Sequence, residues 1–257
     1  MKLRLAVAAI AATVFLTASP RASAELLTLQ LNRTVTGTVT VNLGSKTDNV
    51  TPGPYYWSDI NDPPNTNFPA PIATFCMELL DPNGQPAGSP TVGASFTFEV
   101  LPLTSPYTSL KGDAARADAI KALFGNYYNP AWAGNTFTGD TESKAFQLAL
   151  WELIYETDPT KTLSSGYFNS PSSAATRANQ MLAGLSGGLA IYNAASYEVV
   201  ALVAPTLDPL KQTPGQDQIV VRPKSVPAVP APPALLLAGI GVVALVGRSR
   251  LSRKATA

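Results

Sequence analysis

Two residues in this sequence have chemistry that does not suit their surroundings. Cys76 is the only cysteine among 257 residues. Gln147 begins an apolar stripe on a predicted helix, because Leu150, Trp151 and Ile154 follow it at the i+3, i+4 and i+7 positions. A buried amide without a hydrogen bond costs about 1–3 kcal/mol, so Gln147 needs a partner.

Two partners for the Gln147 amide are compatible with the sequence. One is a backbone group, the usual partner of a buried side-chain amide. The other is Cys76, the only thiol in the chain. The residues alone leave both interpretations open.

The two residues lie on different predicted elements. Cys76 belongs to a β-rich run over residues 72–80, which ends at the turn signal Asp81-Pro-Asn-Gly84. Gln147 belongs to a helix predicted over residues 142–156, with Asp140 or Thr141 as N-cap. Function therefore depends on whether the fold places this strand beside the start of this helix.

Two short motifs carry a family resemblance. Phe75-Cys76 and the run Gln147-Leu-Ala-Leu-Trp151 resemble the bacterial thioester domains of surface adhesins. In that family a cysteine preceded by an aromatic or large apolar residue lies on a strand, and its partner glutamine heads a helix with the motif Thr-Gln-x-Ala-Ile-Trp. Phe146 stands here in place of the family's threonine, and Leu150 in place of its isoleucine. The resemblance extends over residues 70–205.

The resemblance implies a site as well as a fold. Cys76 and Gln147 are the expected thioester pair, and Phe75, Phe146 and Trp151 are expected to wall the pocket that keeps water from the bond. The expected fold is α+β, with a β-sandwich or barrel-like lobe carrying a helical lobe and the pair at their junction. The reaction occurs once in each molecule, so an adhesin is predicted rather than an enzyme, with no cofactor.

Composition excludes several other classes of function. The chain has no histidine, which removes Ser-His-Asp and Cys-His hydrolase sites and histidine-containing zinc sites. Charged residues make up 14% and the formal net charge is +1, so nucleic acid is not an expected partner. No metal site is predicted. A hydrolase or transferase is disfavoured because no base accompanies the thiol.

The N-terminus has the three parts of a secretory signal peptide over residues 1–24. They are a charged start, an apolar run over residues 5–16 and the cleavage motif Ala22-Ser-Ala24. The mature chain is predicted to begin near Glu25. Export places the thiol in a compartment where disulfides persist, and one cysteine cannot form an intramolecular disulfide. Such a thiol must be buried, paired between chains or consumed, and a thioester consumes it.

The C-terminus resembles a sorting signal. Residues 223–233 form a Pro-rich linker, residues 234–246 are apolar, and a basic tail completes the segment 234–257. This pattern is similar to the PEP-CTERM signal of exopolysaccharide-producing Gram-negative bacteria, with Val229-Pro-Ala-Pro232 in place of Val-Pro-Glu-Pro. The positions concerned are Val229, Pro230, Ala231 and Pro232. The resemblance implies transient anchoring in the inner membrane, cleavage by an exosortase, and release to the cell surface or a biofilm matrix. The alternative is a plain C-terminal anchor.

The region between these signals, residues 25–222, is predicted to be one thioester-type adhesin domain. Strands are expected within residues 26–100 and 196–221, around a helical insert over residues 113–187. Residues 26–43 alternate as a strand does, whereas residues 44–71 have the composition of a loop. A helix capped by Asp113 and another opened by Ser170-Pro171 accompany the Gln147 helix.

Two functions therefore compete. The first is covalent attachment through a Cys76–Gln147 thioester to amine groups, such as lysines, on a surface or matrix target. The second is a non-reactive structural or exopolysaccharide-associated surface protein, in which Cys76 is a small buried apolar residue.

Overall fold

The computed structural model describes residues 25–68, 70–79, 91–134, 137, 139–156, 162–185, 197–204 and 216–224. The chain divides into two units, residues 1–223 and 224–257, and the first holds all the elements described below. The predicted signal peptide, the Val229–Pro232 motif and the apolar segment 234–257 lie outside the described residues. None of the helices within the described ranges is long and apolar enough to cross a membrane.

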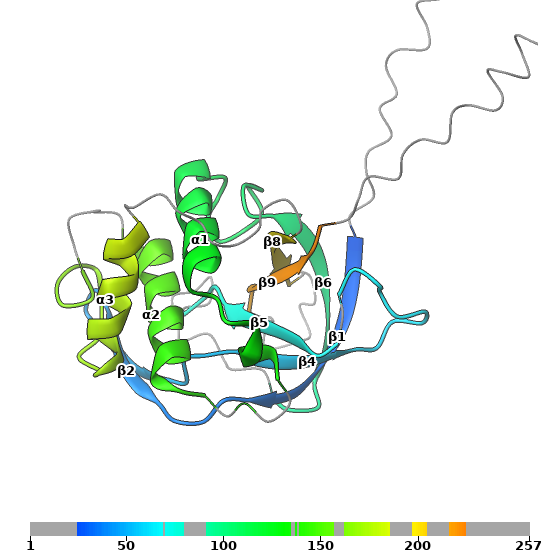
Figure 1. Cartoon of the computed structure of the whole chain (residues 1–257), viewed down its shortest axis with the longest axis horizontal. Helices are drawn as coiled ribbons and strands as arrows, with labels where there is room; N and C mark the ends of the chain where they lie inside the picture. Colours follow the sequence, from blue (N-terminus) through cyan, green and yellow to red (C-terminus); the bar gives the residue numbers. More distant parts are fainter. Residues whose placement is uncertain are drawn as a thin grey trace, which may run out of the picture. The chain divides into compact units, whose positions relative to one another are not determined.

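Six antiparallel strands close into a barrel, which confirms the barrel-like lobe of a mixed α+β fold (Figure 1). In barrel order they are β1 (Glu25–Thr34), β4 (Tyr55–Asp59), β5 (Ile72–Cys76), β9 (Gln218–Pro223), β8 (Tyr197–Val203) and β6 (Ser95–Pro102). Because the barrel is closed, each of these strands pairs with a neighbouring strand on both sides.

The barrel interior is filled by alternate residues of each strand. Leu27, Leu29 and Leu31 of β1 are fully buried, and Leu27 lies opposite the buried Phe98 of β6. Because side chains alternate between the two faces of a strand, the neighbours of inward residues point away from the barrel. The same alternation continues into β5 and β9, and it decides which side chains of the candidate site face inward.

Two strands, β3 (Lys46–Val50) of a small second sheet and the barrel strand β4, lie in the region expected to be loop. β2 (Val39–Leu43) pairs with β3 and with β7 (Phe168–Asn169). The β structure expected over residues 26–43 forms two strands, β1 and β2, and between them Gly37 has a φ of +86°. The loop expected over residues 44–71 contains β3 and the barrel strand β4, which pairs with β1 and β5 along the chain.

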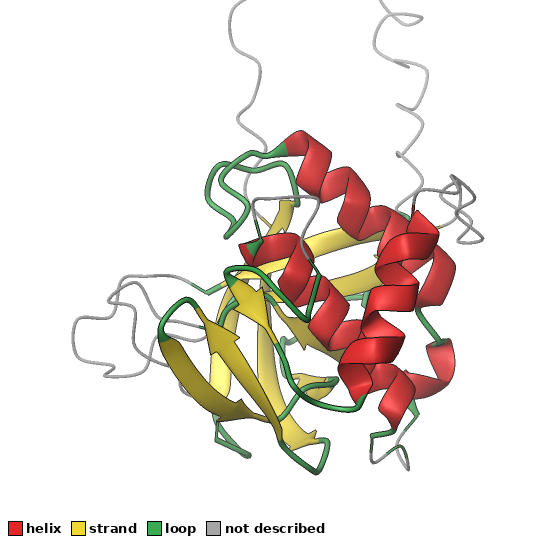
Figure 2. Cartoon of the chain, turned by 90° about the vertical axis from the view of Figure 1, so that its left-hand side faces the viewer, coloured by secondary structure: helices red, strands yellow, loops and turns green. Residues whose placement is uncertain are grey.

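The three α-helices of the described residues gather on one side of the barrel (Figure 2). They are α1 (Ala114–Tyr127), α2 (Thr141–Tyr155) and α3 (Ala174–Gly184), and a short 3-10 helix, η1 (Pro130–Ala133), precedes α2. Asp140 caps α2 through a reciprocal pair of hydrogen bonds with Ser143. The prediction that Ser170 caps the third helix is wrong: its hydroxyl donates to the Thr40 carbonyl at 2.7 Å, and the helix begins four residues later.

Aromatic side chains join the helices to the outer face of β5. The ring of Phe75 lies 4.8 Å from that of Phe146 on α2 and 6.0 Å from that of Phe124 on α1. Trp132 of η1 lies 5.9 Å from Phe75 in the same cluster. Rings in edge-to-face contact at these distances contribute about 0.5–1.5 kcal/mol per pair beyond the area they bury. The cluster therefore fixes the start of α2 against the strand that carries Cys76.

Candidate functional site

Cys76 ends β5 with its side chain at the end of the barrel. Thr74 lies opposite Val220 of β9, and Cys76 lies opposite Gln218. The Cys76 side chain is on the same face as Thr74, away from the aromatic cluster that contains Phe75. It is 1% exposed. The backbone around it must therefore find all its hydrogen bonds within the protein.

The side-chain amide of Gln147 supplies two of those bonds. Its oxygen accepts the Cys76 backbone N–H at 3.2 Å, and its nitrogen donates to the Cys76 carbonyl at 2.9 Å. β4 pairs with β5 only as far as Tyr55 opposite Thr74. The Gln147 amide therefore continues the ladder at Cys76, in the place that a further β4 residue would take.

This arrangement brings together the two residues that the sequence singled out. Gln147 has a backbone partner, which was one of the two expected solutions for a buried amide, and the backbone belongs to Cys76. Among the described contacts the amide and the thiol do not form a hydrogen bond with each other, and both polar atoms of the amide bind the Cys76 backbone. The partners of the thiol are different groups.

The Cys76 sulfur faces a second glutamine, Gln216, which the sequence did not single out. Sγ lies 3.0 Å from Gln216 Oε1 and 2.8 Å from the carbonyl oxygen of Glu78. A C=O bond is about 1.2 Å long, so the Gln216 acyl carbon lies at most about 4.2 Å from the sulfur. A reactive geometry brings two such atoms to about 3–3.5 Å. Gln216 is 5% exposed, so this contact is buried.

Backbone and side-chain bonds hold Gln216 at the entrance to β9. The Met77 N–H donates to the carbonyl of Asp217 at 2.9 Å, extending the pairing of β5 and β9 beyond Cys76. The Gln218 side chain donates to the Gln216 carbonyl at 3.3 Å and accepts from the Thr74 hydroxyl at 2.9 Å. The position of Gln216 thus depends on polar groups inside the barrel.

Two carboxyl groups border the same site. The Glu78 carboxylate accepts the Asp217 backbone N–H at 3.1 Å, and Asp217 accepts the Ala204 N–H at 3.0 Å. The Ser109 hydroxyl lies 3.3 Å from Glu78 Oε1 and 3.2 Å from Asp217 Oδ2. Burial, and after it the charge of Glu78, raise the pKa of Asp217 to about 7.

The thiol is protonated in this environment at neutral pH. Burial raises the pKa of Cys76 far above its usual range, and the Glu78 and Asp217 charges act in the same direction. The hydrogen bond to the Glu78 carbonyl lowers the pKa by a smaller amount than burial raises it. Nucleophilic attack by Cys76 therefore requires a group that removes the thiol proton as the new bond forms.

The residues expected to wall the pocket have packing roles. Phe75 and Phe146 belong to the aromatic cluster on the helix side of β5. Trp151 is 2% exposed, and its ring lies 6.4 Å from that of Phe168 on β7. Phe75 and Phe146 fix the strand and the helix that carry Cys76 and Gln147, so they support the site through the backbone.

No periodic pattern in the sequence marks Gln216. It lies two residues before the strand that begins at Gln218, and its role follows from a contact with a cysteine 140 positions earlier. The available signal was the polar run Gln216-Asp217-Gln218 directly before an apolar strand. A strand that enters a closed barrel must bury its first residues, so polar side chains there need partners.

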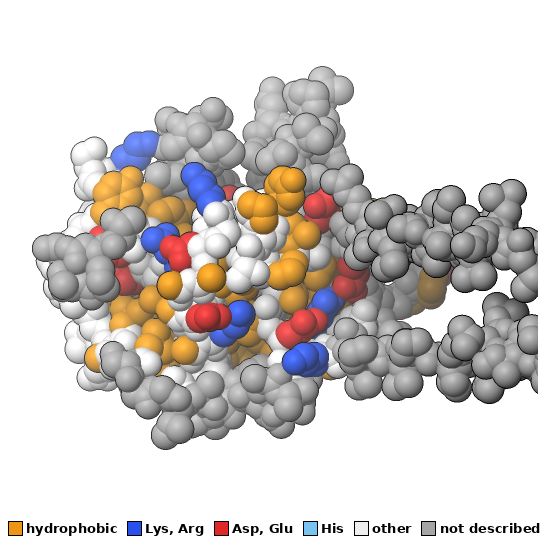
Figure 3. Space-filling model, turned by 90° about the horizontal axis from the view of Figure 1, so that it is seen from above, with side chains coloured by type: hydrophobic (Ala, Val, Ile, Leu, Met, Phe, Trp, Pro, Cys, Tyr) orange, Lys and Arg blue, Asp and Glu red, His pale blue; other side chains and the backbone are white. Residues whose placement is uncertain are grey.

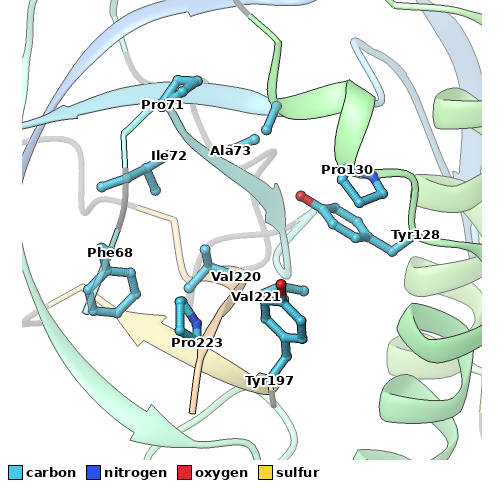
Figure 4. Close-up of a pocket in the computed structure, with 11 residues that line it drawn as sticks. Phe68, Pro71, Ile72, Ala73, Tyr128, Pro130, Tyr197, Val220, Val221 and Pro223 are labelled. Atoms are coloured by element: carbon cyan, nitrogen blue, oxygen red, sulfur yellow. The ribbon is translucent and has the colours of Figure 1, made fainter. Parts of the chain in front are cut away.

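An apolar groove of about 330 Å³ lies elsewhere, where β5 and β9 meet η1 (Figure 4). Tyr128 and Tyr197 border it, together with Phe68, Pro130 and Pro223. Neither Cys76 nor Gln216 lines this groove, so it is separate from the thiol site.

Two further observations concern metal ligands and surface charge. Within the described ranges, no three His, Cys, Asp or Glu side chains cluster as a metal site requires. Figure 3 shows acidic and basic side chains interspersed on one face, with hydrophobic side chains between them.

Comparison of the chain with protein-family models, curated proteins and solved structures finds no match.

Proposed function

We propose that Cys76 and Gln216 form an internal thioester, through which this protein attaches covalently to amine groups on a surface or matrix target. The observation that supports this most directly is the buried contact of 3.0 Å between the Cys76 sulfur and the Gln216 side-chain oxygen. Gln216 replaces Gln147 as the proposed acyl donor, because the Gln147 amide uses both of its polar atoms on the backbone of Cys76.

The proposed chemistry has two steps. First, the thiol attacks the Gln216 acyl carbon, the carbon–nitrogen bond breaks, and the thiol proton leaves with the nitrogen as ammonia. Second, a target amine attacks the thioester carbon, an amide bond forms, and Cys76 regains its proton from the amine. Neither step needs an oxidant, a reductant or a metal. The protein reacts once and remains joined to its target.

Gln147 serves this reaction as a positioning residue. Its two hydrogen bonds fix the backbone of Cys76, and thereby the direction in which the thiol points. Complete burial of Gln147 and near-complete burial of Cys76 keep water from the carbon–sulfur bond. Holding two reacting groups in a productive geometry contributes up to about 7–11 kcal/mol to an intramolecular reaction.

The setting of this activity follows from the terminal signals. The protein is exported through the inner membrane of a Gram-negative bacterium and is held there transiently by its C-terminal segment. An exosortase-type transpeptidase then cleaves it near Val229–Pro232 and releases it to the cell surface or extracellular matrix. The partner is a lysine-bearing surface or matrix molecule, and nucleic acid is not a partner.

Intact mass and peptide mapping test the proposal. The mature protein is expected to be lighter than its sequence by one ammonia and to gain one methylamine on incubation with that amine. Fragmentation of the labelled protein should place the methylamide on Gln216. Cys76→Ala and Gln216→Ala should each abolish labelling, whereas Gln180→Ala, at an exposed glutamine on α3, should leave it unchanged.

The alternative outcomes separate the hypotheses. A methylamide on Gln147 would retain the thioester and overturn the assignment of Gln216. An unmodified mass with no labelling would leave the second function, a non-reactive structural or exopolysaccharide-associated surface protein. One observation favours that function: the thiol donates to the Glu78 carbonyl at 2.8 Å, which is how an inert buried cysteine can satisfy its hydrogen.

A further inference from the structure

Thioester formation needs a route for one proton, and the groups beside Cys76 offer one. The proton leaves a buried thiol and must reach the nitrogen of a buried amide. A free thiolate is costly in this environment, because burial and the charge of Glu78 both raise the thiol pKa. A base and an acid within the site avoid that cost by transferring the proton as the bonds change.

The Ser109 hydroxyl connects the two carboxyl groups of the site. It lies 3.3 Å from Glu78 Oε1 and 3.2 Å from Asp217 Oδ2. A hydroxyl has one hydrogen to donate, so it cannot donate to two carboxylates at the same time. Both contacts are hydrogen bonds if one carboxyl group is protonated and donates to the Ser109 oxygen. The Ser109 hydroxyl then donates to the other carboxyl group, which is ionised.

The two carboxyl groups differ in their relation to the reacting residues. Glu78 follows Cys76 by two residues, and its carbonyl accepts the thiol. Asp217 directly follows Gln216 in the chain, and its N–H donates to the Glu78 carboxylate at 3.1 Å. One carboxyl is thus associated with the segment of the nucleophile, and the other with the segment of the acyl donor.

We propose that Glu78, Ser109 and Asp217 form a proton relay, which takes the thiol proton of Cys76 and delivers a proton to the departing nitrogen of Gln216. The relay rests on the proposed thioester between those two residues. The Glu78 carboxylate accepts the thiol proton as the carbon–sulfur bond forms. The Asp217 carboxylic acid donates its proton to the nitrogen as the carbon–nitrogen bond breaks. Transfer through Ser109 restores the starting protonation, so atoms and charge balance.

The pH dependence of the relay follows from the state of Asp217. Its pKa is raised to about 7, so the stored proton is present below that pH and is lost above it. Formation of the thioester should therefore slow as the pH rises through about 7. Among the described residues, the other titratable groups near the pair are the Cys76 thiol and, on α2, the Tyr155 hydroxyl, whose oxygen accepts the Leu79 N–H at 2.6 Å.

The test follows re-formation of the thioester in the full mature chain. Ammonium treatment should convert the thioester back to free thiol and Gln216. After removal of ammonia, intact mass then records the loss of one ammonia with time, from pH 5 to pH 9. The wild-type rate should fall as the pH rises through about 7. Ser109→Ala should slow the reaction at least about tenfold, at the low end of general acid–base effects.

Two conservative variants distinguish a relay from a packing role. Asp217→Asn keeps an oxygen that can accept the Ala204 N–H, but it cannot lose a proton, so it should abolish the fall in rate near pH 7. Ser109→Thr keeps the hydroxyl and should retain most of the wild-type rate. Ser164→Ala, at an exposed serine, serves as the control for the substitution itself.

The outcomes separate the relay from the function on which it rests. If the wild type re-forms its thioester, but Ser109→Ala and Asp217→Asn match its rate at every pH, the relay is wrong and the thioester stands. If Ser109→Ala does not fold, the pH profile of Asp217→Asn decides, because a wild-type profile in that variant also overturns the relay. A wild-type protein that never carries a thioester overturns the proposed function and the relay together.

Discussion

The side-chain amide of Gln147 binds the backbone of Cys76 as a neighbouring peptide group would. It accepts from the N–H at 3.2 Å and donates to the carbonyl at 2.9 Å, at the point where β4 no longer pairs with β5. A helix residue thus completes a strand ladder, and the strand residue it completes carries the thiol. The resulting order leaves the Cys76 side chain directed at Gln216.

Removal of the Gln147 amide should destabilise the fold even in the absence of a thioester. Gln147→Ala leaves a buried N–H and a buried carbonyl without partners and opens a cavity, so we expect a loss of about 2–4 kcal/mol in unfolding free energy. Urea denaturation of the Cys76→Ala background measures this effect without any contribution from the covalent bond. Gln180→Ala in the same background should change stability by less than about 0.5 kcal/mol. Equal stabilities would show that the backbone bonds are dispensable.

Trp151 should contribute to stability through packing alone. Its side chain is 2% exposed and packs on Phe168, so Trp151→Ala should cost about 3–5 kcal/mol as a large-to-small core substitution. Trp151→Phe retains much of the volume and should cost less. Chemical denaturation at constant pH gives both values, and a midpoint for Trp151→Ala equal to that of the wild type would contradict the core position.

Local patterns predicted the elements that carry the site better than they predicted the site. The α2 helix has a 3.6-residue stripe and an acidic N-cap, both of which are determined by residues close in sequence. Cys76 lies on a short apolar run that forms β5. These elements can be predicted from a single sequence, because residues close together in the chain determine them.

The missed features depend on contacts between distant segments. Residues 55–59 lie among Pro, Asn and Asp residues, and they become β4 because β1 and β5 pair with them on both sides. Gln216 becomes important because β9 lies beside β5 in the closed barrel. The role of Gln147 as acyl donor stays a prediction from the sequence. The sequence indicated that the amide belonged near Cys76, but not which atoms of Cys76 it contacts.

Glu152 should make stability depend on pH. Its side chain is buried on α2 and neither carboxyl oxygen has a hydrogen-bond partner, and burial, followed by the charge of Glu156, raises its pKa to about 7. The folded state therefore binds the proton more tightly than the unfolded state, whose value is 4.5. Its contribution to stability is full below about pH 4.5 and is lost as the pH rises towards 7.

Substitution of Glu152 by glutamine tests whether this carboxyl group lowers the stability of the fold as the pH rises. Glu152→Gln cannot ionise, so its melting temperature should exceed that of the wild type at pH 8, and the difference should shrink as the pH falls to 5. Glu99→Gln, at a half-buried glutamate on β6, controls for the loss of a carboxylate. Asp217 is unchanged in both variants, so its own titration cancels in the comparison. A difference that does not vary with pH would contradict the raised pKa.

Processing should remove both terminal segments without cutting the described fold. β1 begins at Glu25, so cleavage after Ala24 leaves the whole strand in place. Cleavage near Val229–Pro232 falls beyond β9, which ends at Pro223. Terminal sequencing of the surface-released protein should find a start near Glu25 and no basic tail. If Arg253 and Lys254 are retained, the sorting-signal prediction is wrong and the segment is a plain C-terminal anchor.

A chain of hydrogen bonds inside the barrel should control the position of Gln216. The Trp57 indole N–H donates to the Thr74 hydroxyl at 2.8 Å, and that hydroxyl donates to the Gln218 side chain at 2.9 Å. Gln218 in turn donates to the Gln216 carbonyl at 3.3 Å. Thr74 is fully buried, so its hydroxyl has no access to water as a substitute partner.

Thr74→Val should therefore affect both stability and reactivity. The isosteric side chain leaves the Trp57 donor and the Gln218 acceptor unpaired, at an expected cost of about 2–4 kcal/mol in unfolding free energy. Release of Gln218 also frees the backbone of Gln216, so re-formation of the thioester should slow while its pH dependence stays that of the wild type. Thr74→Ser keeps the hydroxyl and should restore the rate. A Thr74→Val protein that is less stable but reacts at the wild-type rate would show that the barrel interior holds the fold without positioning Gln216.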